Sequence, residues 1–151
     1  MKFVRIIQGI ISFIFITLTA CSSGVPGISA MTCEILSKTD DCSAVPMLSS
    51  GHLKIMPDRQ FKLKGQYNAC YHKETVIIYG KYQHSDYGKG ISIELLATKI
   101  KGLKPSEFPS TIAVVTLGKL SLKGVVRDVW ATIRSPENND KSAIEVICKL
   151  D

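Results

Sequence analysis

The stretch that decides the fold of this 151-residue chain is Phe61-Lys62-Leu63-Lys64-Gly65-Gln66-Tyr67-Asn68-Ala69-Cys70-Tyr71. Its odd positions are mostly apolar or aromatic, and its even positions are mostly Lys, Gln and Asn. A period of two predicts a β-strand with one face in a core and the other in water. We therefore expect Phe61, Leu63, Tyr67 and Tyr71 to point inward. Gly65 in mid-strand predicts a bulge or a sharp bend.

Further strand patterns lie on both sides of this stretch. Turn residues (Gly, Pro, Asn, Asp) bound them, and β-branched residues fill them. In 125–134 the spacing predicts Val125, Val129, Ala131 and Ile133 on the inner face and Trp130 opposite. Residues 31–47 fit either a helical turn or a short strand. The other expected strands are 52–56, 75–82, 91–100, 111–117 and 143–150.

The fold class expected from these patterns is all-β. About six or seven strands with no long helix and no internal repeat favour a small antiparallel barrel or a sandwich. An OB-type barrel is one alternative, because a long Gly-bearing strand, two more strands, a loop and two final strands also suit that fold. Strand count alone does not separate these architectures.

A secretory leader precedes the β domain. Lys2 and Arg5 form a positive n-region, and an apolar run covers 6–18. This run is shorter than the roughly 20 apolar residues of a membrane span. Small residues, Thr19 and Ala20, come directly before Cys21. We therefore expect a signal peptide over 1–20, a flexible tether over 21–30 and one β domain over 31–151.

The sequence Leu18-Thr19-Ala20-Cys21 resembles the lipobox of bacterial lipoproteins. The resemblance covers residues 1–21 only, and no family is suggested for the mature domain. It implies cleavage before Cys21, diacylglycerol on the Cys21 sulfur and acylation of the new amino group, hence a palmitate-type anchor. Two or more acyl chains give stable membrane attachment. Ser22, where the family often has an inner-membrane Asp, implies the outer membrane, on its periplasmic or surface face.

Four cysteines remain once Cys21 is assigned to the lipid: Cys33, Cys42, Cys70 and Cys148. An even number in an exported chain predicts two disulfides. Of the three possible connectivities we favour Cys33–Cys42 and Cys70–Cys148. The spacing does not suit a zinc site.

The most plausible binding face combines aromatic and basic residues. Strand alternation in this basic chain (formal net charge +6) interleaves lysines with tyrosines. Such faces bind oligonucleotides or glycans in OB barrels, although tyrosines that cap a core are commoner. Here we expect an envelope protein or glycan, rather than a nucleic acid, as partner. The candidate residues are Lys62, Lys64, Tyr67, Tyr79 and Trp130.

No catalytic, metal or cofactor motif is present in the sequence. Glu94 and Asp128 are the only carboxylates expected at strand centres, and a solvated or ion-paired role suits them better than a glycosidase pair. We therefore expect a non-catalytic lipoprotein that binds an envelope component. The alternatives are a protective lipoprotein similar to lysozyme inhibitors and, less favoured, an envelope-modifying enzyme.

Overall fold

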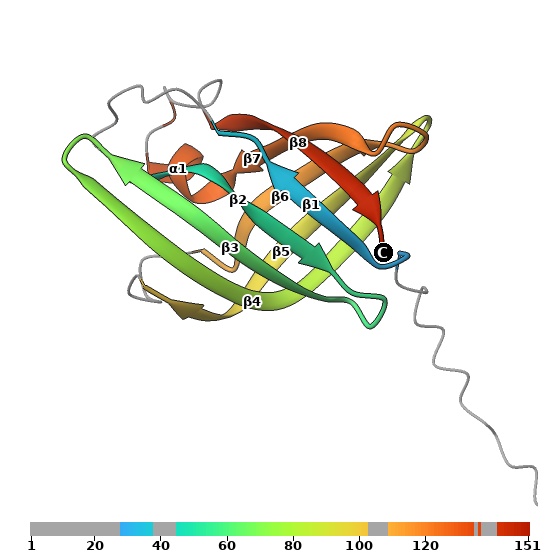
Figure 1. Cartoon of the computed structure of the whole chain (residues 1–151), viewed down its shortest axis with the longest axis horizontal. Coiled ribbons are helices and arrows are strands. Elements are labelled where there is room, and N and C mark those ends of the chain that lie inside the picture. The colour runs from blue at the N-terminus through green and yellow to red at the C-terminus, as the bar shows by residue number, and fades with distance from the viewer. Residues whose placement is uncertain (1–27, 38–44, 103–108, 135, 137–141) are drawn as a thin grey trace, which may run out of the picture.

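The computed structural model describes residues 28–37, 45–102, 109–134, 136 and 142–151. Within these residues eight strands form one closed antiparallel barrel (Figure 1). Each strand pairs with the next in sequence, and the last pairs with the first. The elements are β1 (Met31–Ile35), β2 (Met47–Ile55), β3 (Gln60–Ala69), β4 (His72–Tyr87), β5 (Gly90–Lys101), β6 (Thr111–Gly118), β7 (Lys123–Asp128), α1 (Val129–Arg134) and β8 (Ala143–Leu150).

The all-β antiparallel fold expected from the sequence is confirmed, as the barrel and not the sandwich, with eight strands instead of about six or seven. Its sequential pairing gives an up-and-down barrel, which has more strands than the five of an OB-fold and a different order. Closure leaves no unpaired sheet edge. The sandwich and OB alternatives therefore do not describe this chain.

The barrel interior is filled by side chains that alternate along the strands. In β3 the inward residues Phe61, Leu63 and Tyr67 are buried, as the alternation predicts. Tyr71, expected on the same face, is fully exposed because β3 ends at Ala69 and Tyr71 belongs to the turn. The largest fully buried side chains are Trp130, Tyr67, Tyr82, Phe61, Leu53, Ile55, Leu63, Ile78, Ile93, Leu95, Ile112 and Leu117.

The ambiguous segment 31–47 contributes β1 and the first residue of β2. The bulge expected at Gly65 lies instead on β2, where the register shifts between Leu48 and Ser50. Gly65 pairs regularly with both neighbours. Its lack of a side chain makes room for Leu48, whose Cδ1 would lie 2.7 Å from a Cβ at position 65.

The strand expected over 125–134 is wrong in its second half. β7 ends at Asp128, and α1 follows. The expected faces are wrong at Val125 and Ile133, which are 39 % and 63 % exposed, and at Trp130, which is 2 % exposed and enters the interior. Ala131 is buried, as expected. In β7 the inward residues are Val126 and Asp128, so the expected phase is already wrong before the helix begins. Within α1 a period of two no longer applies.

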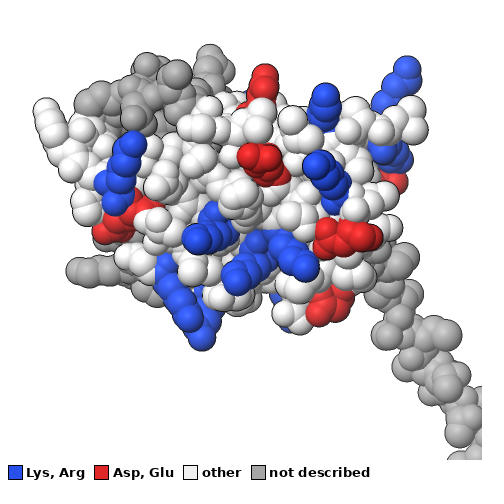
Figure 2. All heavy atoms as spheres, in the orientation of Figure 1, with Lys and Arg blue, Asp and Glu red and all other residues white. Residues whose placement is uncertain are grey.

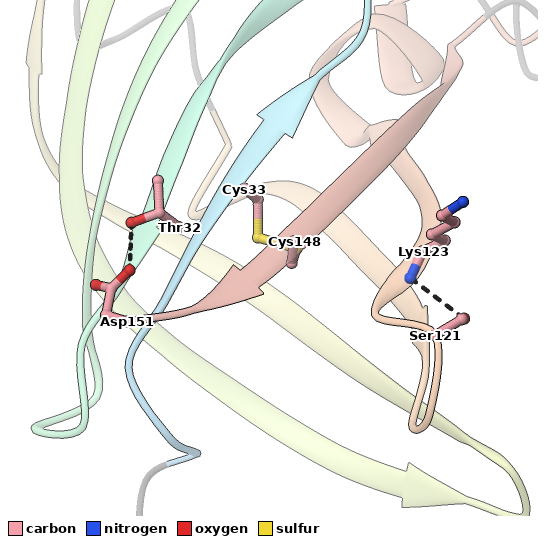
Figure 3. Close-up of a disulfide and its surroundings, with 6 residues drawn as sticks. All are labelled: Thr32, Cys33, Ser121, Lys123, Cys148 and Asp151. Atoms are coloured by element: carbon pink, nitrogen blue, oxygen red, sulfur yellow. Dashed lines mark hydrogen bonds between the residues drawn. A yellow bond between two sulfur atoms is a disulfide. The ribbon is translucent and has the colours of Figure 1, made fainter.

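A disulfide joins Cys33 of β1 to Cys148 of β8 (Figure 3). The two residues are direct cross-strand partners, with Cα atoms 3.9 Å apart. The favoured pairings Cys33–Cys42 and Cys70–Cys148 are therefore wrong. The register could not be anticipated, because it depends on the first strand pairing with the last. Cys70 is also disulfide-bonded. Cys42 lies outside the described residues, as do Cys21 and the expected leader.

Different elements lie at the two ends of the barrel (Figure 1). The hairpin end comprises the turns at 56–59, 87–90 and 118–122, the entering chain at 28–31 and the C-terminal residues 149–151. The helix end comprises α1 and the turn between β3 and β4. In the described parts of the chain, no helix is long and apolar enough to span a membrane.

Candidate functional site

Tyr79 is the centre of a basic surface on the outside of the barrel. It lies on β4 between the inward residues Ile78 and Gly80, so its own side chain points outward and is half-buried. The Nζ atom of Lys62, on β3, lies 5.6 Å from the ring centroid, and that of Lys101, on β5, lies 6.0 Å from it. Both distances suit cation–π interactions. Two neighbouring strands thus hold the ring between two ammonium groups.

Strand register extends this arrangement. Across the sheet Tyr79 lies opposite Lys62 and Lys99. Two residues earlier on β4, Ile77 occupies the equivalent position between one lysine of β3 and one of β5. We call this set the basic face: Lys62, Lys64, Ile77, Tyr79, Lys99 and Lys101.

The charges of the basic face have no acidic partners among the described residues. Elsewhere carboxylates neutralise lysines, for example Asp86 Oδ2 at 3.0 Å from Lys119 Nζ. No described carboxylate comes within ion-pair distance of the four lysines of the basic face. Figure 2 shows blue side chains gathered over β3 and β4. Clustered like charges raise the local positive potential and attract anions.

A polar hollow of about 380 Å³ adjoins the basic face. Lys64 belongs to both. The hollow offers an ammonium, a carboxylate, an amide, an imidazole and hydroxyl groups, which together donate and accept hydrogen bonds. Its polar side chains are Glu34, Ser37, Ser50, His52, Lys64, Gln66 and Thr75.

The structure brings together three of the five residues expected at the binding face. Lys62, Lys64 and Tyr79 lie on adjacent outer positions of β3 and β4. Tyr67 and Trp130 do not belong with them, because both lie in the core, 1 % and 2 % exposed. Tyr67 follows the inward phase of β3, and α1 turns Trp130 inward. Their expected binding role is therefore wrong.

Tyr67 and Trp130 pack against each other at the helix end. Their ring centroids are 5.9 Å apart, with planes at 72°. Edge-to-face pairs of this kind stabilise a core beyond their buried area. Arg134 lies outside them, its Cζ 4.7 Å from the Trp130 ring centroid. The pair fills core space at this end of the barrel.

Asp128 is a buried carboxylate beside this aromatic pair. Its Oδ1 accepts a hydrogen bond from the Ala131 N–H at 3.0 Å, which caps α1, and its Oδ2 accepts one from the Leu48 N–H at 2.9 Å. Burial raises the Asp128 pKa to about 6, although the backbone donors at Leu48, Ala131 and Trp130 oppose the shift. Burial also raises the Tyr67 pKa well above its usual value, and the Asp128 charge adds to this. Asp128 thus joins β2 to the start of α1.

The carboxylates weighed as a catalytic pair are not brought together. Glu94 lies between the inward residues Ile93 and Leu95 of β5 and accepts a hydrogen bond from Thr111 Oγ1 at 2.6 Å. Asp128 is 1 % exposed and caps a helix. Among the described residues, no group of three or more His, Cys, Asp or Glu side chains is placed to hold a metal ion.

Two lysines of the basic face, together with Ile77, were not expected from the sequence. Lys99 and Lys101 follow a register shift in the β4–β5 pairing at Tyr79 and Gly80. Alternation counted from Ile91 would place Lys99 and Lys101 on the inner face, but the shift moves both to the outer face. Their pairing with Tyr79 and Ile77 is therefore not visible in the sequence. The only available signal was the recurrence of lysine at every second position of 99–101.

Comparisons with known proteins find no matching family model, no matching curated protein and no matching solved structure. The function must therefore be argued from the chemistry of the basic face and the hollow.

Proposed function

We propose that this chain is an outer-membrane lipoprotein, attached through acyl chains on Cys21, whose non-catalytic barrel binds an anionic envelope glycan. The proposed site is the basic face with the adjoining polar hollow. The leader and the lipobox-like sequence before Cys21 support the anchor, and the unneutralised lysines support the anionic ligand.

The observation that carries the binding proposal is the arrangement around Tyr79. Two ammonium groups lie within about 6 Å of one ring, and no described carboxylate balances them. Mutual repulsion of the lysines is relieved when a phosphate or carboxylate binds among them. An aromatic ring and an aliphatic side chain, Ile77, give the same site an apolar base.

The polar hollow favours a glycan over an acidic protein surface. Sugars present many hydroxyl groups in a small volume, and each needs a donor or an acceptor when water is displaced. The hollow supplies both kinds from β1 to β4, including the Glu34 carboxylate and the Gln66 amide. A negatively charged sugar can place its charge on the basic face and its hydroxyls in the hollow.

Binding is tested with the oligosaccharide portion of lipopolysaccharide, measured by titration calorimetry at low and high salt. We expect Lys62→Gln with Lys101→Gln to weaken binding about tenfold, because each exposed charge contributes up to about 1 kcal/mol. Lys149→Gln on β8 is the matched control and should leave affinity unchanged. Equal losses in both variants, or no binding by the native chain, would overturn the glycan site.

A photocrosslinking residue at position 79 in intact cells tests the partner class. Capture of glycan supports the proposal, whereas capture of an acidic protein alone would replace the glycan with that protein at the same face. A crosslinker at position 147, an outward position of β8, is the control for non-specific capture.

The anchor is tested separately. Cys21→Ser should move the protein from the membrane fraction to the soluble fraction, because it removes the thiol that carries the diacylglycerol. Mass spectrometry of the native mature chain should detect the acyl groups. Membrane retention of the variant would refute the lipoprotein reading.

A further inference from the structure

The hairpin end of the barrel carries exposed apolar side chains that the proposed glycan site does not use. Leu120 is fully exposed at the tip of the β6–β7 turn, and Tyr87, at the β4–β5 turn, is 49 % exposed. Leu150, near the C-terminus, is 59 % exposed. Half of the exposed large hydrophobic residues in the described chain thus lie at one end of the molecule.

The turns that carry these side chains are held by hydrogen bonds and an ion pair. The Lys119 N–H donates to the Lys89 carbonyl at 2.9 Å, and the Leu122 N–H donates to the Gly118 carbonyl at 2.9 Å. Lys119 Nζ also pairs with Asp86 of the neighbouring hairpin. The two hairpins therefore form one connected unit that projects Leu120 into solvent.

An apolar hollow of about 540 Å³ lies beside the two hairpins. The Tyr87 ring and Val125 are among the side chains that line it, and Gly90 and Gly118 contribute positions without side chains. Lys89 and Lys123 lie at its margin. Apolar side chains flanked by lysines are typical of surfaces that rest in the headgroup region of a bilayer.

The entering chain reaches the barrel at this same end. The Ile28 N–H donates to the Tyr82 hydroxyl at 3.1 Å, and that hydroxyl donates to the Met56 carbonyl at 2.9 Å. Cys21 precedes Ile28 by seven residues, which span at most about 25 Å when fully extended. An acylated Cys21 would keep the hairpin end, and not the helix end, close to the lipid.

We propose that the hairpin end docks on an anionic phospholipid surface, with Leu120 and Tyr87 at the level of the headgroups and Lys89 and Lys123 near lipid phosphates. This inference rests on the proposed acylation of Cys21. In this orientation the barrel axis lies roughly along the membrane normal. The basic face, on the barrel wall, then points parallel to the membrane surface.

Docking is tested with the mature acylated chain reconstituted into vesicles of phosphatidylglycerol and phosphatidylcholine with brominated acyl chains. The fluorescence that Leu120→Trp adds to that of native Trp130 should fall roughly twofold or more relative to unbrominated vesicles, because interfacial side chains reach about 5–10 Å into the bilayer boundary. Tyr71→Trp, fully exposed at the opposite end, is the matched control and should be unaffected. Each variant is measured in brominated and in unbrominated vesicles, so any quenching by nearby disulfides is the same in both measurements.

Charge is tested in the Leu120→Trp background. Lys89→Glu with Lys123→Glu should reduce the bromine effect, whereas Lys62→Glu with Lys64→Glu should not. Equal effects at positions 120 and 71, or none at 120, would overturn the docking. Mass spectrometry of the same sample separates the causes: an acylated chain without quenching refutes docking alone, and an unacylated chain refutes the anchor.

Discussion

At the helix end, the two buried rings Tyr67 and Trp130 pack edge to face beside the capped carboxylate of Asp128. At the hairpin end, a single buried tyrosine, Tyr82, ties the entering chain to the β2–β3 turn through its hydroxyl. Both ends also expose apolar side chains, Tyr71 and Ile133 at the first and Leu120 and Tyr87 at the second, but only the first packs two buried rings against each other.

This difference suggests separate roles: the helix end stabilises the fold, and the hairpin end offers a surface for interaction. Buried aromatic area and satisfied hydrogen bonds contribute free energy of folding, so we expect the helix end to govern unfolding. Exposed apolar groups on turns held in place contribute little to folding and become stabilising only against a partner surface. Substitutions at matched exposed and buried positions test whether the two ends contribute differently to the free energy of unfolding.

The largest effect is expected at Trp130. Trp130→Ala should lower the free energy of unfolding by about 3–5 kcal/mol, because it removes the ring that fills the helix end and leaves a cavity. Urea denaturation followed by far-UV circular dichroism measures this. Ile133→Ala, on the same helix but 63 % exposed, should change stability by less than about 0.5 kcal/mol. Similar losses in the two variants would show that the helix, and not its buried ring, matters.

Asp128→Ala should follow, with a loss of about 2–3 kcal/mol. It removes the cap of α1 and leaves the buried Leu48 N–H without its acceptor. Asp86→Ala breaks an exposed ion pair at the hairpin end and should cost less than about 1 kcal/mol. Equal costs for the two would contradict the assignment of stability to the helix end.

The pH dependence of unfolding sharpens the same contrast. Asp128 has a pKa of about 6 when folded, above its unfolded value, so the folded state retains a proton that the unfolded state has released. The contribution of Asp128 to stability is therefore greatest below about pH 4 and falls, by roughly 3 kcal/mol, as the pH rises to about 6. In Asp128→Asn this fall should be absent, so it should appear as the difference between the native and variant curves. An unchanged pH profile would mean that Asp128 titrates near its usual range.

The smallest effect on folding is expected at Leu120. Leu120→Ser should change the free energy of unfolding by less than about 0.5 kcal/mol, because the side chain is fully exposed. Thermal denaturation of the variant in solution checks this. A large loss would mean that the hairpin tip contributes to the folded core, which would remove the reason for a separate surface role.

Much of the barrel wall could be predicted from the sequence, because the alternation in 61–69 and 143–150 and the apolar run in 75–82 follow from local side-chain burial. The predictions failed where local pattern and tertiary structure diverge. Strand closure placed Cys33 opposite Cys148. In β7 the inward phase includes the carboxylate Asp128, which alternation of apolar residues does not predict, and Trp130 follows it into the interior. Lys62, Lys64 and Tyr79 were anticipated because they lie on regular strands, whereas Lys101 was hidden behind a register shift.

The Cys33–Cys148 bond has a mechanical consequence for a barrel held by its N-terminal side. A pull on the entering chain reaches β1 first, and within two residues of Met31 it meets a covalent link to the last strand. Force is then shared between β2, through hydrogen bonds, and β8, through sulfur. β1 therefore cannot separate from β8 by breaking hydrogen bonds alone. A barrel pulled from its N-terminal side stays closed until the disulfide or the other strand pairs give way.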